Sequence, residues 1–198
     1  MSKLKEYFRR FRFYLRLTGV APISRRYFVM NLFDGAMAAL GVIIGAWTSG
    51  PVQPRIIIGA GLGMSLAMGI SGFSGTYLVE RAERLRRLRE IEKSLLMGLE
   101  DSIHGKAMRI ATVWAATVDA LSPALAALAS ISPFVLAYRN LISVDQAAAF
   151  SVVIILAILF SLGVFTGKIS RERVFVSGIR MLVVGAITAI LLLIIGRM

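Results

Sequence analysis

The stretch that decides the fold is Asn31-Leu-Phe-Asp34-Gly35-Ala-Met37-Ala-Ala-Leu-Gly41-Val-Ile-Ile-Gly45, an apolar run with one carboxylate inside it. It belongs to a longer apolar segment, about residues 28 to 48. A bilayer core of about 30 Å takes about 20 apolar helical residues, so this segment is long enough to span a membrane. An ionised aspartate there costs roughly 2.5 to 3.5 kcal/mol, so Asp34 needs a cation, a proton or a polar cavity as its partner. Asp34 is therefore the first candidate site residue.

The same apolar pattern recurs along the chain. Of 198 residues, 57% are hydrophobic, and the mean hydropathy is +0.76. Three further segments are long and apolar enough to span a bilayer: about 56 to 78, 147 to 167 and 176 to 196. The stretch from Ala107 to Tyr138 is a fifth candidate, although it is interrupted by Asp119, Pro123 and Pro133. The predicted fold is an all-α integral membrane protein with five transmembrane helices.

The net charge of +12 is distributed unevenly over the connections between these spans. Basic residues gather in residues 1 to 27, after the second span and after the fourth, whereas the opposite connections hold only Arg55, Arg139 and the terminal Arg197. By the positive-inside rule, the N-terminus and the long connection are cytoplasmic and the C-terminus lies on the opposite side, in the cell membrane if the chain is prokaryotic. This distribution favours membrane lipid over nucleic acid as the partner of the positive charge.

Four regions follow from these patterns. Residues 1 to 27 begin with apolar and aromatic residues at helical spacing and basic residues on other faces, which predicts an amphipathic helix on the membrane surface. This segment lacks the short apolar core of a cleavable signal peptide. Residues 28 to 78 form a transmembrane hairpin around a short turn, residues 79 to 106 a cytoplasmic helical segment, and residues 107 to 198 spans three to five.

Several kinds of chemistry are excluded by composition. The chain has no cysteine, so it has no disulfide and no thiolate metal site, and any metal ligand is an oxygen, a nitrogen or a thioether sulfur. It has no Ser/His/Asp set, no phosphate-binding glycine loop, no HExxH motif and no paired carboxylate motif. We therefore expect no enzymatic activity and no permanently bound cofactor.

The cytoplasmic segment contains two kinds of acidic residue. Glu80 and Glu83 stand four positions before Arg84 and Arg87, so a solvated, self-paired helix face explains them without a function. Farther on, one approximate helical face carries Met97, Glu100, Asp101, His104 and Met108. Carboxylates with an imidazole suit divalent first-row metals, and the alternative is a set of ordinary polar residues at a membrane surface.

Within the spans, three more residues are candidates for a metal site. Met64 and Met68 lie four residues apart on the second span, where packing is the alternative explanation for methionine. Asp119 lies in the third span before the interruption at Pro123, and its burial costs about as much as that of Asp34. Arg180, early in the last span, is a possible counter-charge for either acid if it points inward.

Three parts of the chain resemble the vacuolar iron transporter family of five-span divalent-metal transporters. They are Asp34-Gly35 leading into Leu40 to Gly45; Gly69 to Leu78 running into a helix with Glu80 and Glu83; and Ser177 to Gly185. The likeness covers about residues 28 to 198. It implies a homodimer whose first spans line a pathway, with Asp34 as the pathway aspartate, cytoplasmic glutamates and methionines that collect the ion, and proton-coupled export.

Two departures from the family pattern lie beside this path, since the family usually has Met at the position of Gly72 and Glu at that of Thr76. We expect a dimeric antiporter that exports Fe2+ or Mn2+ as its substrate. Asp34, with Met64 or Met68 and with Asp119 as a further candidate, would bind the ion at membrane depth, and the residues that collect it would be Glu80, Glu83, Glu100, Asp101 and His104. The departures leave a second reading open, a non-transporting scaffold or regulator with the same fold, and a membrane-embedded lipid enzyme is a third.

Overall fold

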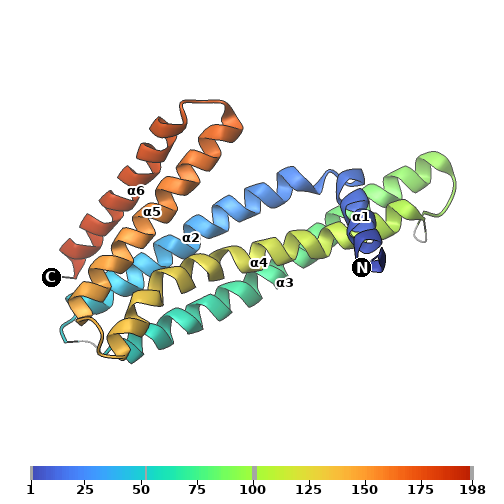
Figure 1. The fold of residues 1–198 in the computed structure, drawn as a ribbon. Coiled ribbons are helices and arrows are strands. Elements are labelled where there is room, and N and C mark those ends of the chain that lie inside the picture. The colour runs from blue at the N-terminus through green and yellow to red at the C-terminus, as the bar shows by residue number, and fades with distance from the viewer. Residues whose placement is uncertain (1, 52, 100–101, 197–198) are drawn as a thin grey trace. The chain divides into compact units, whose positions relative to one another are not determined.

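The computed structural model describes residues 2–51, 53–99 and 102–196, which form six helices and no strand (Figure 1). The helices are α1 (Ser2–Leu17), α2 (Val20–Thr48), α3 (Pro54–Leu95), α4 (Ile103–Tyr138), α5 (Val144–Ser170) and α6 (Val174–Ile195). Five of them, α2 to α6, are long and apolar enough to cross a membrane. The predicted all-α fold with five transmembrane helices is confirmed.

Helix α3 is longer than a membrane span requires. It has 42 residues, and at about 1.5 Å per residue it is about 60 Å long, roughly twice the thickness of a hydrocarbon core. Its first half is apolar, and its second half, from Glu80 onward, is rich in charge. The apolar half alone is long enough for one span, and the helix continues through the charged residues, as the sequence predicted for this segment.

The chain divides into two compact units. The first comprises Met1–Phe28 and Ile70–Leu121, and the second comprises Val29–Gly69 and Ser122–Met198. The long helices α2, α3 and α4 each contribute to both units. Asp34, Met64 and Met68 belong to the second unit, whereas Glu80 and Asp119 belong to the first.

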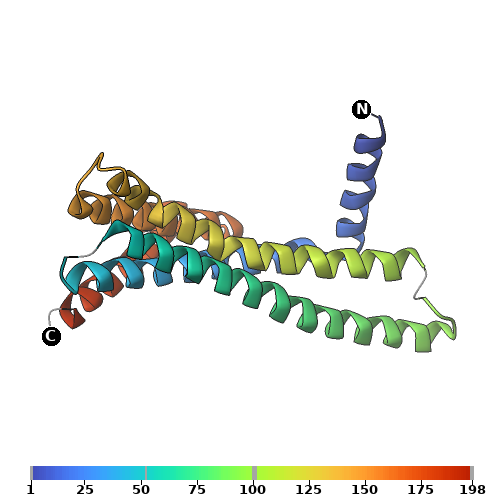
Figure 2. The ribbon, with the colours of Figure 1, turned by 90° about the horizontal axis from the view of Figure 1, so that it is seen from below.

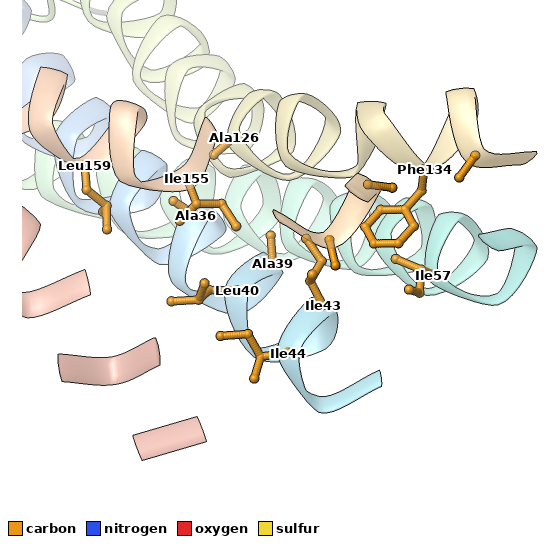
Figure 3. Close-up of a cluster of buried hydrophobic side chains, with 13 residues drawn as sticks. Ala36, Ala39, Leu40, Ile43, Ile44, Ile57, Ala126, Phe134, Ile155 and Leu159 are labelled. Carbon is orange, nitrogen blue, oxygen red and sulfur yellow. The ribbon is translucent and has the colours of Figure 1, made fainter. Parts of the chain in front are cut away.

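The second unit has an apolar core built from four helices (Figure 3). Helix α2 contributes its buried face, which repeats at helical spacing and includes Ala36, Leu40 and Ile43. Phe134 of α4 and Ile155 of α5 complete the centre of the cluster and are fully buried. Alanine is frequent on these faces because small side chains let helix backbones approach closely in a membrane.

Helices α5 and α6 pack as a hairpin through glycine. A Cβ atom at Gly163 would overlap the Ser177 carbonyl oxygen and the Cα atom of Gly178, so the two backbones are in direct contact there. The N-terminus of α5 is closed by a capping box, in which the Ser143 hydroxyl accepts from the Gln146 backbone N–H. Helices α5 and α6 therefore form one closely packed pair.

Helix α4 runs without interruption through Pro123 and Pro133, so the predicted interruption at Pro123 is wrong. Proline lacks an N–H group and would break an isolated helix, but neighbouring helices support such residues in membrane proteins. Here α2 lies against the proline. A Cβ at Gly35 would be 2.5 Å from the Pro123 carbonyl oxygen and 2.6 Å from its Cα. Glycine at position 35 is therefore required for this contact.

The first unit is smaller and more polar. Its apolar cluster consists of Val20, Ala111 and Ala115, with Leu15 packed against it. The predicted amphipathic helix is present as α1, and the Phe11 ring meets the Trp114 ring edge-to-face at 5.5 Å. The charged half of α3 runs beside the first half of α4 (Figure 2). The facing sides of these two helix halves hold most of the buried polar residues described next.

Candidate functional site

A stripe of polar residues follows one face of α3 within the first unit. Gly72, Thr76, Glu80 and Arg84 are each four positions apart, so they lie one above the other on the same side of the helix. The exposed fractions of Thr76, Glu80 and Arg84 are 9%, 8% and 6%. Buried polar groups are costly without partners, so each of these side chains calls for an explanation.

Asp119 of α4 is the partner of Thr76. The Thr76 Oγ1 hydroxyl donates a hydrogen bond to Asp119 Oδ2 at 2.8 Å, and Asp119 is only 5% exposed. Gly72 leaves space for the same carboxylate, because a Cβ at this position would lie 2.9 Å from Asp119 Oδ2 and 3.5 Å from the Asp119 carbonyl oxygen. The two departures from the family pattern, Gly72 and Thr76, are therefore both in contact distance of one buried acid.

The backbone at Asp119 is also unusual. Pro123 stands four positions later and has no N–H group, so it cannot give the Asp119 carbonyl the usual helical hydrogen bond. The side-chain and backbone oxygens of Asp119 both lie near Gly72. Together with Thr76 Oγ1 they form a group of oxygens of the kind that hard divalent cations prefer. We call Gly72, Thr76 and Asp119 the Asp119 site.

Glu80 is held from two sides. The Tyr27 hydroxyl donates to Glu80 Oε1 at 3.1 Å, and Arg84 Nη2 lies 2.8 Å from Glu80 Oε2. The predicted pairing of Glu80 with Arg84 is confirmed, but the description of this pair as solvated is wrong. The side chains of Glu80 and Arg84 are 11% and 8% exposed, because the neighbouring elements of the first unit cover them.

The remaining residues predicted to collect an ion are not gathered into one place. Glu83 pairs with Arg87 at 3.5 Å on the exposed surface, and His104 is exposed near the start of α4. Glu100 and Asp101 lie outside the described residues. Within the described ranges, no group of three or more His, Cys, Asp and Glu side chains could hold a metal ion. A cytoplasmic collecting site stays a prediction.

Asp34, in the second unit, lies on a face of α2 that is opposite to the core. Its side chain is exposed, and it makes no hydrogen bond or ion pair with any residue that the structure describes. Gly41 and Gly45 are on the same side of the helix, and a Cβ at either would meet no heavy atom within 4 Å among the described residues. This open face therefore presents a carboxylate that would be costly to expose to lipid.

The two methionines differ from Asp34 in their surroundings. Met64 is partly buried and packs against the core of the second unit, so packing alone explains a methionine at this position. Met68, one turn later on α3, is also partly buried. Arg180, considered above as an inward counter-charge, is exposed and lies 3.3 Å from Glu172. Its charge is therefore already paired at the start of α6.

Comparison with known sequences identifies the chain's relatives. The sequence profile of the VIT family matches residues 87–197. The chain belongs to the VIT family. A 40% identical relative is an uncharacterized protein of Methanocaldococcus jannaschii; the match extends over 171 residues, 84% of this chain and 85% of the relative. The resemblance stated from the sequence is confirmed, and the chain is an integral membrane protein of a transporter family.

In this VIT-family chain, sequence reasoning found Asp119 but missed its surroundings. The signal was present in two spacings. Gly72, Thr76, Glu80 and Arg84 repeat every four residues along α3, and Pro123 follows Asp119 by four. Nothing in the sequence indicated that Thr76 would face Asp119, because that contact joins residues 43 positions apart on different helices.

Proposed function

We propose that this protein is a proton-coupled transporter that exports divalent metal ions, Fe2+ or Mn2+, from the cytoplasm by alternating access. The observation that supports the proposal most is the Asp119 site, a buried carboxylate with a hydroxyl donor on a helix that crosses the membrane. Its oxygen ligands suit these ions better than Cu+, which prefers sulfur. Membership of the VIT family supports transport of a metal ion.

The coupling to protons follows from the same chemistry. A carboxylate at membrane depth is stable either as the neutral acid or with a bound cation, because the bare anion is costly there. Release of a metal ion would therefore be accompanied by uptake of protons along the ion path. This exchange is what an antiporter requires.

Thr76 and Asp119 also suggest how the chain keeps the function despite its departures from the family pattern. Where the family usually has a glutamate at the position of Thr76, this chain has a carboxylate opposite it, at 2.8 Å from the threonine hydroxyl. We infer that Asp119 supplies from α4 the negative charge that other members supply from the second span. This argument favours transport over a scaffold that has lost its ion path.

A homodimer would complete the environment of Asp34. The open face of α2, with Gly41 and Gly45 beside the carboxylate, leaves room for close approach of another helix. If the α2 helices of two copies meet there, the two Asp34 side chains line a shared path rather than face lipid. Met68 is the better methionine candidate for this path, because Met64 packs against the core.

On the cytoplasmic side, Glu83, Glu100, Asp101 and His104 are proposed to collect the ion. Glu80 is a weaker candidate than Glu83, because Arg84 already neutralises it in a buried pair. A metal ion would have to displace that guanidinium, whereas the exposed pair of Glu83 with Arg87 contributes little and is easily broken.

Flux into proteoliposomes tests the function. With Fe2+ or Mn2+ on one side and a proton gradient across the membrane, we expect uptake that Asp34→Asn and Asp119→Asn each reduce by roughly tenfold or more, since a loss of about 1.4 kcal/mol in ion binding is tenfold. The matched control is Asp145→Asn. Asp145 is exposed, and its Oδ1 accepts from Trp47 Nε1 at 2.9 Å, a bond that asparagine retains.

The outcomes separate the two functions. Absence of flux of any divalent ion in the unaltered protein would contradict transport and favour the scaffold. Unchanged flux in Asp119→Asn would remove Asp119 from the path while leaving the function intact. Calorimetric titration gives an independent readout, because metal binding that is lost in the combined variant Glu100→Gln and His104→Ala supports the cytoplasmic collecting site.

A further inference from the structure

The first unit contains a pocket that the transport proposal does not use. It has a volume of about 440 Å3 and lies between the charged half of α3 and the first half of α4. Its polar lining residues are Tyr77, Arg81, Arg84, Arg109 and Thr112. The described lining residues include three arginines and no acidic residue, and of these arginines Arg84 is paired with Glu80.

Arg84 is the buried arginine among the residues that line this pocket. It is 6% exposed, and its Nη2 atom lies 2.8 Å from Glu80 Oε2. Its Nε group makes no hydrogen bond with any described residue, and its Nη2 group meets Glu80 as an ion pair. A buried guanidinium with unfilled donors is rare in proteins, because each donor has lost its water. Glu80, which accepts a hydrogen bond from Tyr27, holds Arg84 from one side, and the Arg84 Nε group has no acceptor among the described residues.

The pocket lies where the apolar half of α3 passes into its charged half, which is the level of a membrane surface. A second pocket of about 550 Å3 adjoins it and shares Arg109 and Val113. This second pocket has a mainly apolar lining that includes Phe11 of α1 and Trp114 of α4. A positive pocket and an apolar pocket therefore meet at one edge.

We propose that these two pockets together bind one anionic phospholipid, with its phosphate at Arg81 and Arg84 and part of its glycerol or acyl chain in the apolar pocket. Guanidinium groups suit phosphate because their planar donors match two of its oxygens at once. The Tyr77 hydroxyl is a further donor on the same wall. A phosphate oxygen that reached Arg84 Nε would give this group the hydrogen bond that the described residues do not supply.

The apolar pocket favours a phospholipid over a free phosphate ion as the source of the phosphate group. A free phosphate ion would fill only the arginine pocket and gain nothing from Phe11 and Trp114, whereas a lipid gains from both. A lipid in the apolar pocket would contact both α1 and α4, because Arg10 and Tyr14 of α1 line this pocket as well. The bound lipid would thereby fix the amphipathic helix against the first unit.

Native mass spectrometry of the full chain in detergent tests the proposal, with phosphatidylglycerol, phosphatidylcholine or inorganic phosphate as the added probe. We expect one phosphatidylglycerol to bind about tenfold more tightly than phosphatidylcholine, a difference of about 1.4 kcal/mol. The combined variant Arg81→Gln and Arg84→Lys should lose this preference. Lysine at position 84 keeps the charge that Glu80 needs, so the variant is expected to fold.

The matched control is Arg86→Gln, which changes a charge on the same helix outside the pocket, in a pair with Glu90 that is mostly exposed. It should keep the preference within about twofold. An equal loss in the control, or no loss in the pocket variant, would overturn the site. Binding of inorganic phosphate without binding of phosphatidylglycerol would overturn the assignment to lipid. Arg81→Gln alone, on an exposed side chain, should weaken the preference in the same direction even if the combined variant folds poorly.

Discussion

At the scale of single residues, the surroundings of the buried Asp119 side chain are set by residues of another helix. Asp119 was recognisable in the sequence as a costly charge in an apolar helix. Its surroundings depend on Thr76, which donates a hydrogen bond to it, and on Gly72, which leaves it room. Neither residue is notable by type, so the sequence pointed to the acid but not to its site.

The variant Gly72→Ala tests the space around Asp119. Because the new Cβ would lie 2.9 Å from Asp119 Oδ2, we expect the carboxylate to shift and the protein to lose about 1 to 3 kcal/mol of unfolding free energy in detergent. The control is Gly75→Ala, where a Cβ meets nothing within 4 Å and alanine is the better helix former. Equal thermal midpoints for the two variants would mean that position 72 has no steric role.

At the scale of elements, the lengths of the apolar segments were enough to predict the helices. They were not enough to predict whether a proline would break one of them. The sequence predicted all five spans and the helical continuation of the second, since about 20 apolar residues form a helix in a bilayer. It treated Pro123 as an interruption. The helix nevertheless continues, and α2 packs against the proline backbone at Gly35, a tertiary contact that local propensity does not contain.

Gly35→Ala is the corresponding test between α2 and α4. The Cβ would lie within 3 Å of three backbone atoms of Pro123, and backbone cannot move aside as a side chain can. We expect a loss of about 1 to 3 kcal/mol or more in stability. The control is Gly59→Ala, a helical glycine with open space around it. A destabilisation of Gly59→Ala as large as that of Gly35→Ala would contradict the packing argument.

At the scale of the whole molecule, the homodimer proposed above would form through the open face of α2. Gly41→Leu would place a large side chain beside Asp34 on that face and block close helix approach. We expect the variant to shift from dimer to monomer in light scattering during size-exclusion chromatography, with its fold intact. Gly59→Leu, on the open side of α3, is the control. If Gly59→Leu dissociates the dimer and Gly41→Leu does not, the interface lies on α3 instead.

The sequence by itself determined the class of this protein, its five spans, the helical extension of α3 and its membership of the VIT family, because each depends on local composition or on short motifs. It also identified the two intramembrane acids. Only the tertiary structure decided which of them is covered: Asp119 is buried against Thr76, whereas Asp34 is exposed. The tertiary structure also showed that the Glu80–Arg84 pair is buried rather than solvated. The reason is that helical periodicity defines which residues share a face, but the partner of each face is set by packing between helices distant in sequence.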